Sequence, residues 1–229
     1  MDQKDLPVGA PLPDWKPRAR PGRQELAGRY CRLEPLAAER HAADLFEAYA
    51  GDTAGVGWTY LPYGPFKTVE AFGSWLSEVS SKDEPLFFAI LDGGGTVVGV
   101  ASYLRINPEM GSIEVGHIHY SPQLQRTLEA TEAMYLMARR AFDELGYRRY
   151  EWKCDDLNAA SRRAADRLGF VYEGTFRQDR IYKGRNRDTA WYSITDGEWP
   201  AVRAAFEAWL EPANFDANGQ QLTRLSTPK

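Results

Sequence analysis

The segment from His117 to Met137 carries the residues best suited to binding a phosphate group. It reads HIHYSPQLQRTLEATEAMYLM, a pattern that predicts a strand, a short polar loop and a helix. Backbone N–H groups at the start of a helix bind anions, and glycine normally allows close approach to them. This loop has Arg126 and Thr127 instead. Two hypotheses follow: a phosphate site in which Arg126 supplies charge and Thr127 caps the helix, or an ordinary helix after a strand.

Groups suited to acid–base chemistry lie on either side of this loop. Glu114 belongs to the strand before it, and His117 and His119 alternate on the same strand and titrate near neutral pH. Asn158 and Ser161 stand three residues apart at the start of a second predicted helix. The same spacing is that of an ordinary helix cap, so a catalytic and a structural interpretation both remain.

The composition restricts the class of protein. The chain has 229 residues and a formal net charge of −4, which does not favour nucleic acid as a partner. No apolar run has transmembrane length, and the proline-rich N-terminus lacks the core of a signal peptide. Cys31 and Cys154 lie far apart without metal-ligand spacing. These features predict a reduced cytoplasmic protein without disulfides that binds no metal, nucleic acid or membrane.

Hydrophobic periodicity predicts the elements that would position these residues. The predicted strands cover residues 29–36, 86–92, 96–106, 112–120 and 147–154, followed by a hairpin over 170–194 that turns at KGRN. The predicted helices cover residues 37–50, 68–81, 128–143, 158–169 and 198–210. Three successive strands predict an antiparallel meander, and the strand–helix–strand crossover predicts one parallel pair. The fold class is therefore α+β with a mixed sheet.

The two ends of the chain differ in composition from the part between them. Residues 1–27 are rich in proline and arginine and are predicted to form an N-terminal arm anchored by Trp15. Residues 28–210 form the predicted domain, and residues 211–229 a polar C-terminal tail. Whether these arms mediate a homodimer is left open.

Four segments of the chain resemble the GNAT acyltransferase superfamily, in its branch of ribosomal-protein N-terminal acetyltransferases (RimJ/RimL-like). They are GSIEVGHIHYSP, ATEAMYLM, YEWKCDDLN and NAASRRAADRLGFVYEGTFRQ. The last is the most specific, because Asn158, Ser161, Arg-Leu-Gly-Phe and Glu-Gly occur in family order. The resemblance covers residues 28–210 and implies the GNAT (acyl-CoA N-acyltransferase) fold, a mixed central sheet splayed at the acetyl-CoA site and flanked by helices.

The resemblance implies acetyl-CoA as co-substrate, with its pantetheine arm between the splayed strands and its pyrophosphate at the following helix N-terminus. The family pattern Gln/Arg-x-x-Gly-x-Gly/Ala falls on residues 123–128, where Gln123 matches and Arg126 and Leu128 replace the two glycines. The residues implied to bind the co-substrate are His119, Tyr120, Gln123, Arg126, Thr127, Leu128, Asn158 and Ser161.

The resemblance also implies roles in catalysis and in acceptor binding. Ser161 is the candidate for stabilising the leaving thiolate, Glu114 for deprotonating the amine directly or through water, and Asp179 is a further carboxylate in a position where relatives place an acid. The acceptor wall is expected in the first helical region, where aromatic residues could hold an amine by cation–π contacts or could simply pack together. These aromatic residues are Trp58, Tyr60, Tyr63 and Phe66.

The predicted function is N-acetylation of a primary amine, either a peptide N-terminus or a small molecule, by direct attack on acetyl-CoA in a ternary complex. Two alternatives stay open. One is an acyl-CoA-binding or interaction module that has lost catalysis with its loop glycines. The other is the same fold with a larger acyl donor such as succinyl-CoA.

Overall fold

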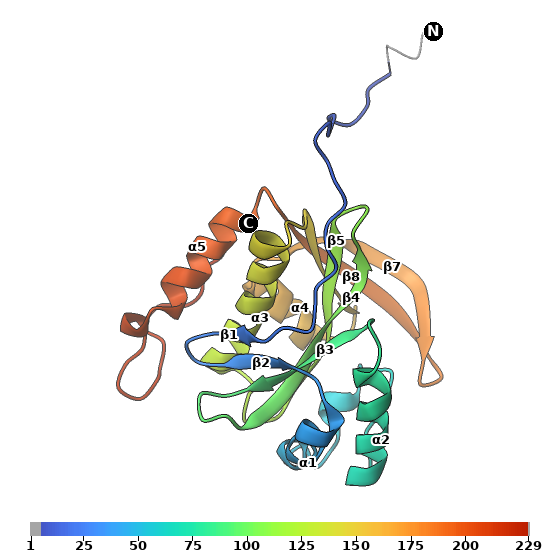
Figure 1. Cartoon of the computed structure of the whole chain (residues 1–229), viewed down its shortest axis with the longest axis vertical. Helices are drawn as coiled ribbons and strands as arrows, with labels where there is room; N and C mark the ends of the chain where they lie inside the picture. Colours follow the sequence, from blue (N-terminus) through green and yellow to red (C-terminus); the bar gives the residue numbers. More distant parts are fainter. Residues whose placement is uncertain (1–5, 229) are drawn as a thin grey trace.

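The structure is a computed structural model that describes residues 6–228 (Figure 1). Its strands are β1 (Leu26–Ala27), β2 (Arg32–Pro35), β3 (Leu86–Leu91), β4 (Val97–Asn107), β5 (Ser112–Tyr120), β6 (Arg149–Asp155), β7 (Val171–Tyr182) and β8 (Arg185–Thr195). Its α-helices are α1 (Ala38–Tyr49), α2 (Val69–Ser80), α3 (Leu128–Arg139), α4 (Ala159–Arg167) and α5 (Trp199–Leu210). Short helical turns lie at η2 (Val56–Trp58), η3 (Arg140–Glu144) and η4 (Pro212–Asn214).

All eight strands form one sheet in the order β1-β2-β3-β4-β5-β6-β8-β7. β5 and β6, joined through α3, pair in parallel, and the other neighbours pair in antiparallel. The predicted meander, the parallel crossover and the α+β class are thereby confirmed. The final hairpin also turns where it was predicted, between β7 and β8 at Lys183 and Gly184.

Helices cover both faces of the sheet and produce two cores. α1 and α2 pack on one face, where Leu45 and Phe72 belong to the same buried cluster as Phe87 and Ala89 of β3. α3 and α5 pack on the other face, where the core also includes Phe88 and its neighbours (Figure 1). Successive side chains of a strand point to opposite faces, so the whole of β3 is buried and reads as an uninterrupted apolar run.

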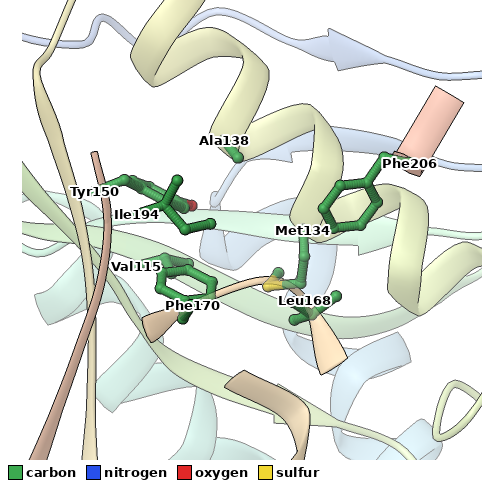
Figure 2. A pocket seen from close by; sticks show the side chains of 8 residues that line it. All are labelled: Val115, Met134, Ala138, Tyr150, Leu168, Phe170, Ile194 and Phe206. Atoms are coloured by element: carbon green, nitrogen blue, oxygen red, sulfur yellow. The ribbon is translucent and has the colours of Figure 1, made fainter. Parts of the chain in front are cut away.

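The larger core contains one small cavity between α3 and the sheet (Figure 2). Apart from the Tyr150 hydroxyl its lining is apolar, and that hydroxyl has no hydrogen-bond partner within residues 6–228. The cavity therefore offers no set of groups for catalysis. It is lined by Val115, Met134, Ala138, Tyr150, Leu168, Phe170, Ile194 and Phe206.

Local capping rules account for the helix ends at three positions. Thr68 accepts a hydrogen bond from Ala71 N and caps α2, and Asn158 accepts one from Ser161 N and caps α4. After α4, Gly169 has a φ of 92°. Phe170 N–H then reaches Ala165 O at 3.0 Å, which closes the helix in a Schellman motif.

Two boundaries differ from the prediction because of long-range contacts. The first strand is limited to β2, since Glu132 of α3 accepts hydrogen bonds from the N–H groups of Arg29, Tyr30 and Cys31 and fixes them as a turn. The helix after β5 keeps α geometry only to Arg139 and continues as a π-helical turn. In that turn the buried Arg140 donates to carbonyl oxygens of the N-terminal segment.

The N-terminal segment extends away from the domain at its start, reaches it at Trp15 and then runs along it (Figure 1). Trp15 Nε1 donates to Glu109 O at 2.8 Å, and Tyr147 hydroxyl donates to Ala19 O at 3.1 Å. The Trp15 ring occupies the space where Gly111 would otherwise carry a Cβ atom. Trp15 therefore anchors this segment. Among residues 6–228, no helix combines the length and the apolar character that a membrane span requires.

Candidate active site

β5 and β6 separate in the middle of the sheet. They pair only where Ser112–Val115 of β5 face Arg149–Trp152 of β6. Both strands continue beyond that point, but β5 follows β4 through a bulge in which His117 has a φ of 51°. A bulge bends its strand away from the partner. The carboxyl ends of β5 and β6 are therefore splayed, as the resemblance implied.

The splay leaves main-chain groups of β5 unpaired. Ser121 N–H donates to Val98 O at 3.0 Å, so this end of β5 is bonded to β4. Backbone groups of successive residues point to opposite edges of a strand. The N–H of Tyr120 is therefore expected to point into the splay, while its buried hydroxyl donates to Ala130 O at 3.3 Å. Tyr120 thus offers a main-chain donor rather than its side chain.

The loop after β5 delivers a capped helix N-terminus to the same end of the sheet. Arg126 is exposed and has a φ of 64°, the left-handed conformation that the family's glycine would adopt easily. Thr127 Oγ1 accepts from Ala130 N at 3.2 Å and donates to Leu124 O at 2.8 Å. The N–H groups of Leu128 and Glu129 lie in the first turn of α3 and have no acceptor within the helix. The loop therefore keeps a glycine-like backbone without glycine.

The side chains of this loop differ in their surroundings. Arg126 makes no ion pair or side-chain hydrogen bond with any residue of the described chain. Gln123 is exposed, whereas Leu124 is buried and anchors the loop on the domain. Leu128 is half-buried as the first residue of α3. Arg126 and Gln123 are thus accessible beside the helix N-terminus.

The start of α4 lies against the end of β6. Trp152 Nε1 donates to Ser161 Oγ at 2.9 Å, and Ser161 N donates to Asn158 Oδ1 at 3.0 Å. Ser161 also lowers the pKa of the neighbouring Cys154 thiol, although burial raises that pKa more. Because its oxygen accepts from Trp152, the hydroxyl hydrogen of Ser161 is directed to a different acceptor, and the Cys154 sulfur is one such neighbour.

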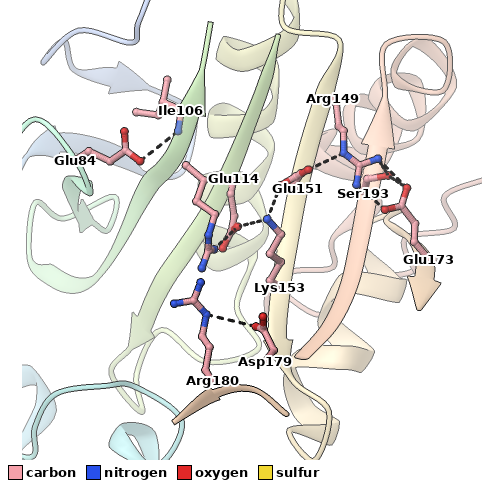
Figure 3. Close-up of polar contacts among 11 residues, drawn as sticks. Glu84, Ile106, Glu114, Arg149, Glu151, Lys153, Glu173, Asp179, Arg180 and Ser193 are labelled. Atoms are coloured by element: carbon pink, nitrogen blue, oxygen red, sulfur yellow. Dashed lines mark hydrogen bonds and ion pairs between the residues drawn. The ribbon is translucent and has the colours of Figure 1, made fainter. Parts of the chain in front are cut away.

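A row of charged side chains crosses the face of the sheet that lies opposite to α3 (Figure 3). Glu114 Oε2 lies 2.5 Å from Arg105 Nη1 and 3.0 Å from Lys153 Nζ. Lys153 Nζ also lies 2.6 Å from Glu151 Oε2 and 3.7 Å from the centre of the Trp191 ring. Both ion pairs of Glu114 use Oε2. Its other oxygen, Oε1, receives no hydrogen bond from the residues described.

Asp179 belongs to the β7 strand that lines this charged row. The strand bulges between Phe176 and Arg180, where Asp179 borders an open hollow. Asp179 Oδ2 accepts from Thr189 Oγ1 at 2.8 Å and lies 3.4 Å from Arg180 Nε. Figure 3 shows Asp179 and Arg180 pointing toward Lys153 and Glu114. The predicted carboxylates Glu114 and Asp179 thus lie on the same side of the sheet, near Lys153.

The four predicted aromatic residues divide into two pairs. Trp58 and Phe66 pack with each other, at 5.6 Å between ring centres, as part of the core under α1 and α2. Tyr63 hydroxyl lies 3.1 Å from His117 Nδ1, and Tyr60 hydroxyl donates to Leu157 O at 3.3 Å. The two tyrosines therefore reach the borders of the splay through their hydroxyls, whereas Trp58 contacts β5 through the buried ring of His119.

The two histidines of β5 are both neutral at pH 7. His119 is buried against Tyr49 and Trp58, with ring centres at 4.0 and 3.9 Å, and burial lowers its pKa to about 4. Burial also lowers the pKa of His117 to about 4, with smaller effects from Arg105 and Arg187. His119 is thus a packed core residue, and its backbone groups, like those of Ser121, point toward β4 and not into the splay.

Sequence reasoning did not select Arg105 and Lys153, the cations that hold Glu114. A signal was present for Lys153, since a lysine interrupts the apolar strand YEWKC. A charged residue inside a buried strand is rare unless it is paired. Its partner comes from a strand distant in sequence, which local patterns do not reveal.

Comparisons with known proteins agree with this architecture. Residues 31–171 match the family model of the acetyltransferase (GNAT) domain. A GCN5-related N-acetyltransferase from Brucella melitensis is 49% identical over 93% of this chain and 97% of its own, with a TM-score of 0.92. A structure described as a "probable" GNAT acetyltransferase from Chromobacterium violaceum is 42% identical over 86% and 98%, with a TM-score of 0.79. The chain belongs to the GNAT family and is an acyltransferase.

More distant structures share the fold alone. The microcin C7 self-immunity acetyltransferase, in complex with acetyl-CoA and AMP, is 20% identical over 73% of this chain and 93% of its own, with a TM-score of 0.64. The ribosomal L7/L12 α-N-protein acetyltransferase RimL is 18% identical over 79% and 98%, also with a TM-score of 0.64. No curated protein matches the chain.

Proposed function

We propose that this enzyme transfers an acetyl group from acetyl-CoA to a primary amine by direct attack in a ternary complex. The observation that carries the proposal is the separation of β5 from β6 after Val115 and Trp152, beside the capped N-terminus of α3. The unpaired edge of β5 suits the amide groups of a pantetheine arm. A distant relative of the same fold holds acetyl-CoA, which supports the choice of donor.

The phosphates of the donor would bind at the loop and first turn of α3. The free N–H groups of Leu128 and Glu129 offer hydrogen bonds, and the helix dipole favours an anion there. Arg126 and Gln123 are exposed on the same loop and can add side-chain contacts. The left-handed backbone at Arg126 keeps the loop shape for which relatives use glycine. Loss of the glycines therefore does not imply loss of binding.

The chemistry requires an unprotonated amine and a stabilised leaving group. As the amine nitrogen bonds to the thioester carbonyl carbon, the N–H of Tyr120 would donate to the developing oxyanion. Glu114 would take the amine proton through water at Oε1, the oxygen that its ion pairs leave unused. When the C–S bond breaks, Ser161 would donate a hydrogen bond to the leaving thiolate and so stabilise it. Asp179 is the second candidate base.

The state of the cysteines supports direct attack. Cys154 and Cys31 are both buried, and burial is the main cause of the raised pKa of each thiol. A thiol must ionise to act as a nucleophile. Neither cysteine is therefore suited to carry the acetyl group as a covalent intermediate.

The acceptor and the branch of the family belong to the same proposal. The likeness to RimL, whose acceptor is a ribosomal protein N-terminus, favours a peptide α-amine as one class of acceptor, with small-molecule amines as the other. Turnover measured with a series of acyl-CoA donors, from acetyl-CoA to succinyl-CoA, would identify the acyl group that the enzyme transfers. Tyr60 and Tyr63 border the splay and are the aromatic residues best placed to contact the amine.

The test combines calorimetry of acetyl-CoA binding with a screen of amines that reads release of free thiol. The proposal predicts binding of acetyl-CoA and turnover of at least one amine. Binding without turnover of any amine would indicate a module that has lost catalysis. Absence of binding at millimolar acetyl-CoA, with the protein shown to be folded, would overturn the proposal.

A further inference from the structure

The β7–β8 hairpin places two arginines side by side next to the proposed site. Arg180 of β7 is paired directly with Arg187 of β8 in the antiparallel ladder. Directly opposite residues of neighbouring strands share one face of the sheet, and like charges in this arrangement destabilise it. Arg180 has Asp179 at 3.4 Å as its ion-pair partner. The pair therefore carries more positive charge than its surroundings neutralise.

Arg187 lacks an acidic partner altogether. Across residues 6–228 it forms no ion pair and donates no side-chain hydrogen bond, although its Nε is buried. Its guanidinium lies 5.9 Å from the centre of the Tyr182 ring. The nearby Asp155 carboxylate is already engaged, because Tyr182 hydroxyl donates to Oδ2 at 2.8 Å. A partly buried cation without a counter-ion is unfavourable, and a bound anion would relieve it.

Both arginines of the pair lie near residues of β5. Figure 3 shows Arg180 pointing toward Glu114. Arg105 and Arg187 both lie close enough to His117 to lower its pKa, although burial is the larger cause. His117 is the residue of the β5 bulge from which the splay begins. Arginines from β4, β7 and β8 thus gather at the mouth of the splay.

Apart from Asp179, the carboxylates of this region are paired with other cations. Glu114 is shared by Arg105 and Lys153, and Glu151 is shared by Lys153 and Arg149. Lys153 links Glu114 and Glu151 into a connected row (Figure 3), and neither of these carboxylates forms an ion pair with Arg180 or Arg187. A planar guanidinium matches the two oxygens of a carboxylate or phosphate.

We infer that the amine acceptor carries an oxyanion, either a carboxylate or a phosphate, which binds between Arg180 and Arg187 while the amine lies toward the splay. This inference rests on the proposed acetyl transfer and names the chemical class of its acceptor. Arg180 and Arg187 are then residues that determine specificity, and they do not take part in proton transfer. Coenzyme A also carries phosphates, so the experiment separates acceptor binding from donor binding.

The experiment measures kcat/KM for matched acceptors that differ in one anionic group. The probes are a dipeptide and its C-terminal amide for the carboxylate, and phosphoethanolamine and ethanolamine for the phosphate, each rate being referred to the concentration of free amine. The anionic member of one pair should be preferred by about 10- to 100-fold. Arg187→Gln and the double variant Arg180→Gln/Arg187→Gln should bring that ratio near unity without changing acetyl-CoA affinity.

Arg224→Gln is the matched control, because Arg224 is an exposed arginine of the C-terminal tail. It should preserve the preference. Absence of preference in both pairs, or a preference that survives in the double variant, would overturn the inference. So would arginine variants that weaken acetyl-CoA binding and leave acceptor KM unchanged, because the arginines would then serve the donor.

The inference can fail or stand separately from the proposed function. If no probe is acetylated, calorimetry of the same four probes on the CoA-bound protein replaces kinetics. Binding of an anionic probe that is lost in Arg187→Gln would support the anion site even though acetyl transfer is wrong. Equal binding of charged and neutral probes would overturn it.

Discussion

The indole N–H of Trp152 donates to Ser161 Oγ at 2.9 Å. This bond joins the last residue of β6 that pairs with β5 to the first turn of α4. It fixes the serine hydroxyl beside the splay and leaves its hydrogen to an acceptor other than Trp152. The same serine is held through its backbone by the Asn158 cap. The helix-cap interpretation and the catalytic interpretation of Asn158 and Ser161 are therefore compatible, since the cap is what orients the hydroxyl.

Ser161→Ala should lower kcat by about 10²-fold or more and leave the acetyl-CoA dissociation constant nearly unchanged, because thiolate stabilisation matters only as the C–S bond breaks. Steady-state kinetics and calorimetry measure the two quantities. Trp152→Phe is the control, since it keeps the serine and removes the donor that orients it. It should produce a smaller loss of kcat. Full kcat in Ser161→Ala would leave Ser161 as a helix residue alone.

Arg126 can be tested with two substitutions that remove the same charge. Arg126→Ala and Arg126→Gly should both weaken CoA binding more than binding of a pantetheine fragment without pyrophosphate, because a charge-assisted phosphate contact is worth roughly 1.5–3 kcal/mol. Only Arg126→Gly should also stabilise the fold, by about 1 kcal/mol, since glycine adopts the left-handed backbone without strain. Equal losses for CoA and the fragment would show that Arg126 acts through folding.

Glu114→Gln should flatten the acid limb of the pH–rate profile, since a base must be unprotonated to accept the amine proton. The variant also leaves Arg105 without its counter-ion, so rates are referred to the folded fraction measured by circular dichroism. An acceptor of low pKa keeps the amine's own titration out of the profile. Asp179→Asn is the matched control and should retain the acid limb of the pH–rate profile. The reverse pattern would transfer the role of base to Asp179.

Acidification should destabilise the protein through its buried histidines. The pKa of His119 and that of His117 are each lowered from 6.5 to about 4, mainly by burial. The unfolded chain therefore binds more protons than the folded chain between these values, and stability present above pH 6.5 is lost as the pH falls toward 4. Each histidine accounts for roughly 3 kcal/mol over the whole interval.

Urea unfolding at pH 7 and pH 5 measures this dependence. His119→Gln should reduce stability at pH 7, because the ring stacks on Tyr49, but should make the loss between the two pH values smaller. An unchanged difference between pH 7 and pH 5 in this variant would contradict the assignment of the effect to His119.

The parts of the fold that follow local rules could be predicted from the sequence. The caps at Thr68 and Asn158 and the glycine end at Gly169 are short-range features, and the structure contains all three. The apolar run of β3 and the turn at Lys183 are likewise local. The splay was expected only through the family resemblance, because the bulge at His117 has no signature in the surrounding residues.

The electrostatic part of the site depends on pairings across strands. Glu114 meets Lys153 because β5 and β6 are parallel neighbours. Arg180 lies opposite Arg187 because the bulge in β7 between Phe176 and Arg180 shifts the register of the hairpin. A change of register by one residue would separate each pair. Sequence patterns place these residues on strands but do not give the register.

The most direct test of the central claim is amide hydrogen exchange with and without acetyl-CoA. The account places the donor along the free edge of β5 and at the first turn of α3, so acetyl-CoA should slow exchange in peptides that contain Tyr120, Leu128 and Glu129. Peptides from α1 and from the C-terminal tail serve as internal references and should exchange at unchanged rates. Saturating acetyl-CoA that protects none of these three amides, or that protects a different part of the sheet, would contradict the account.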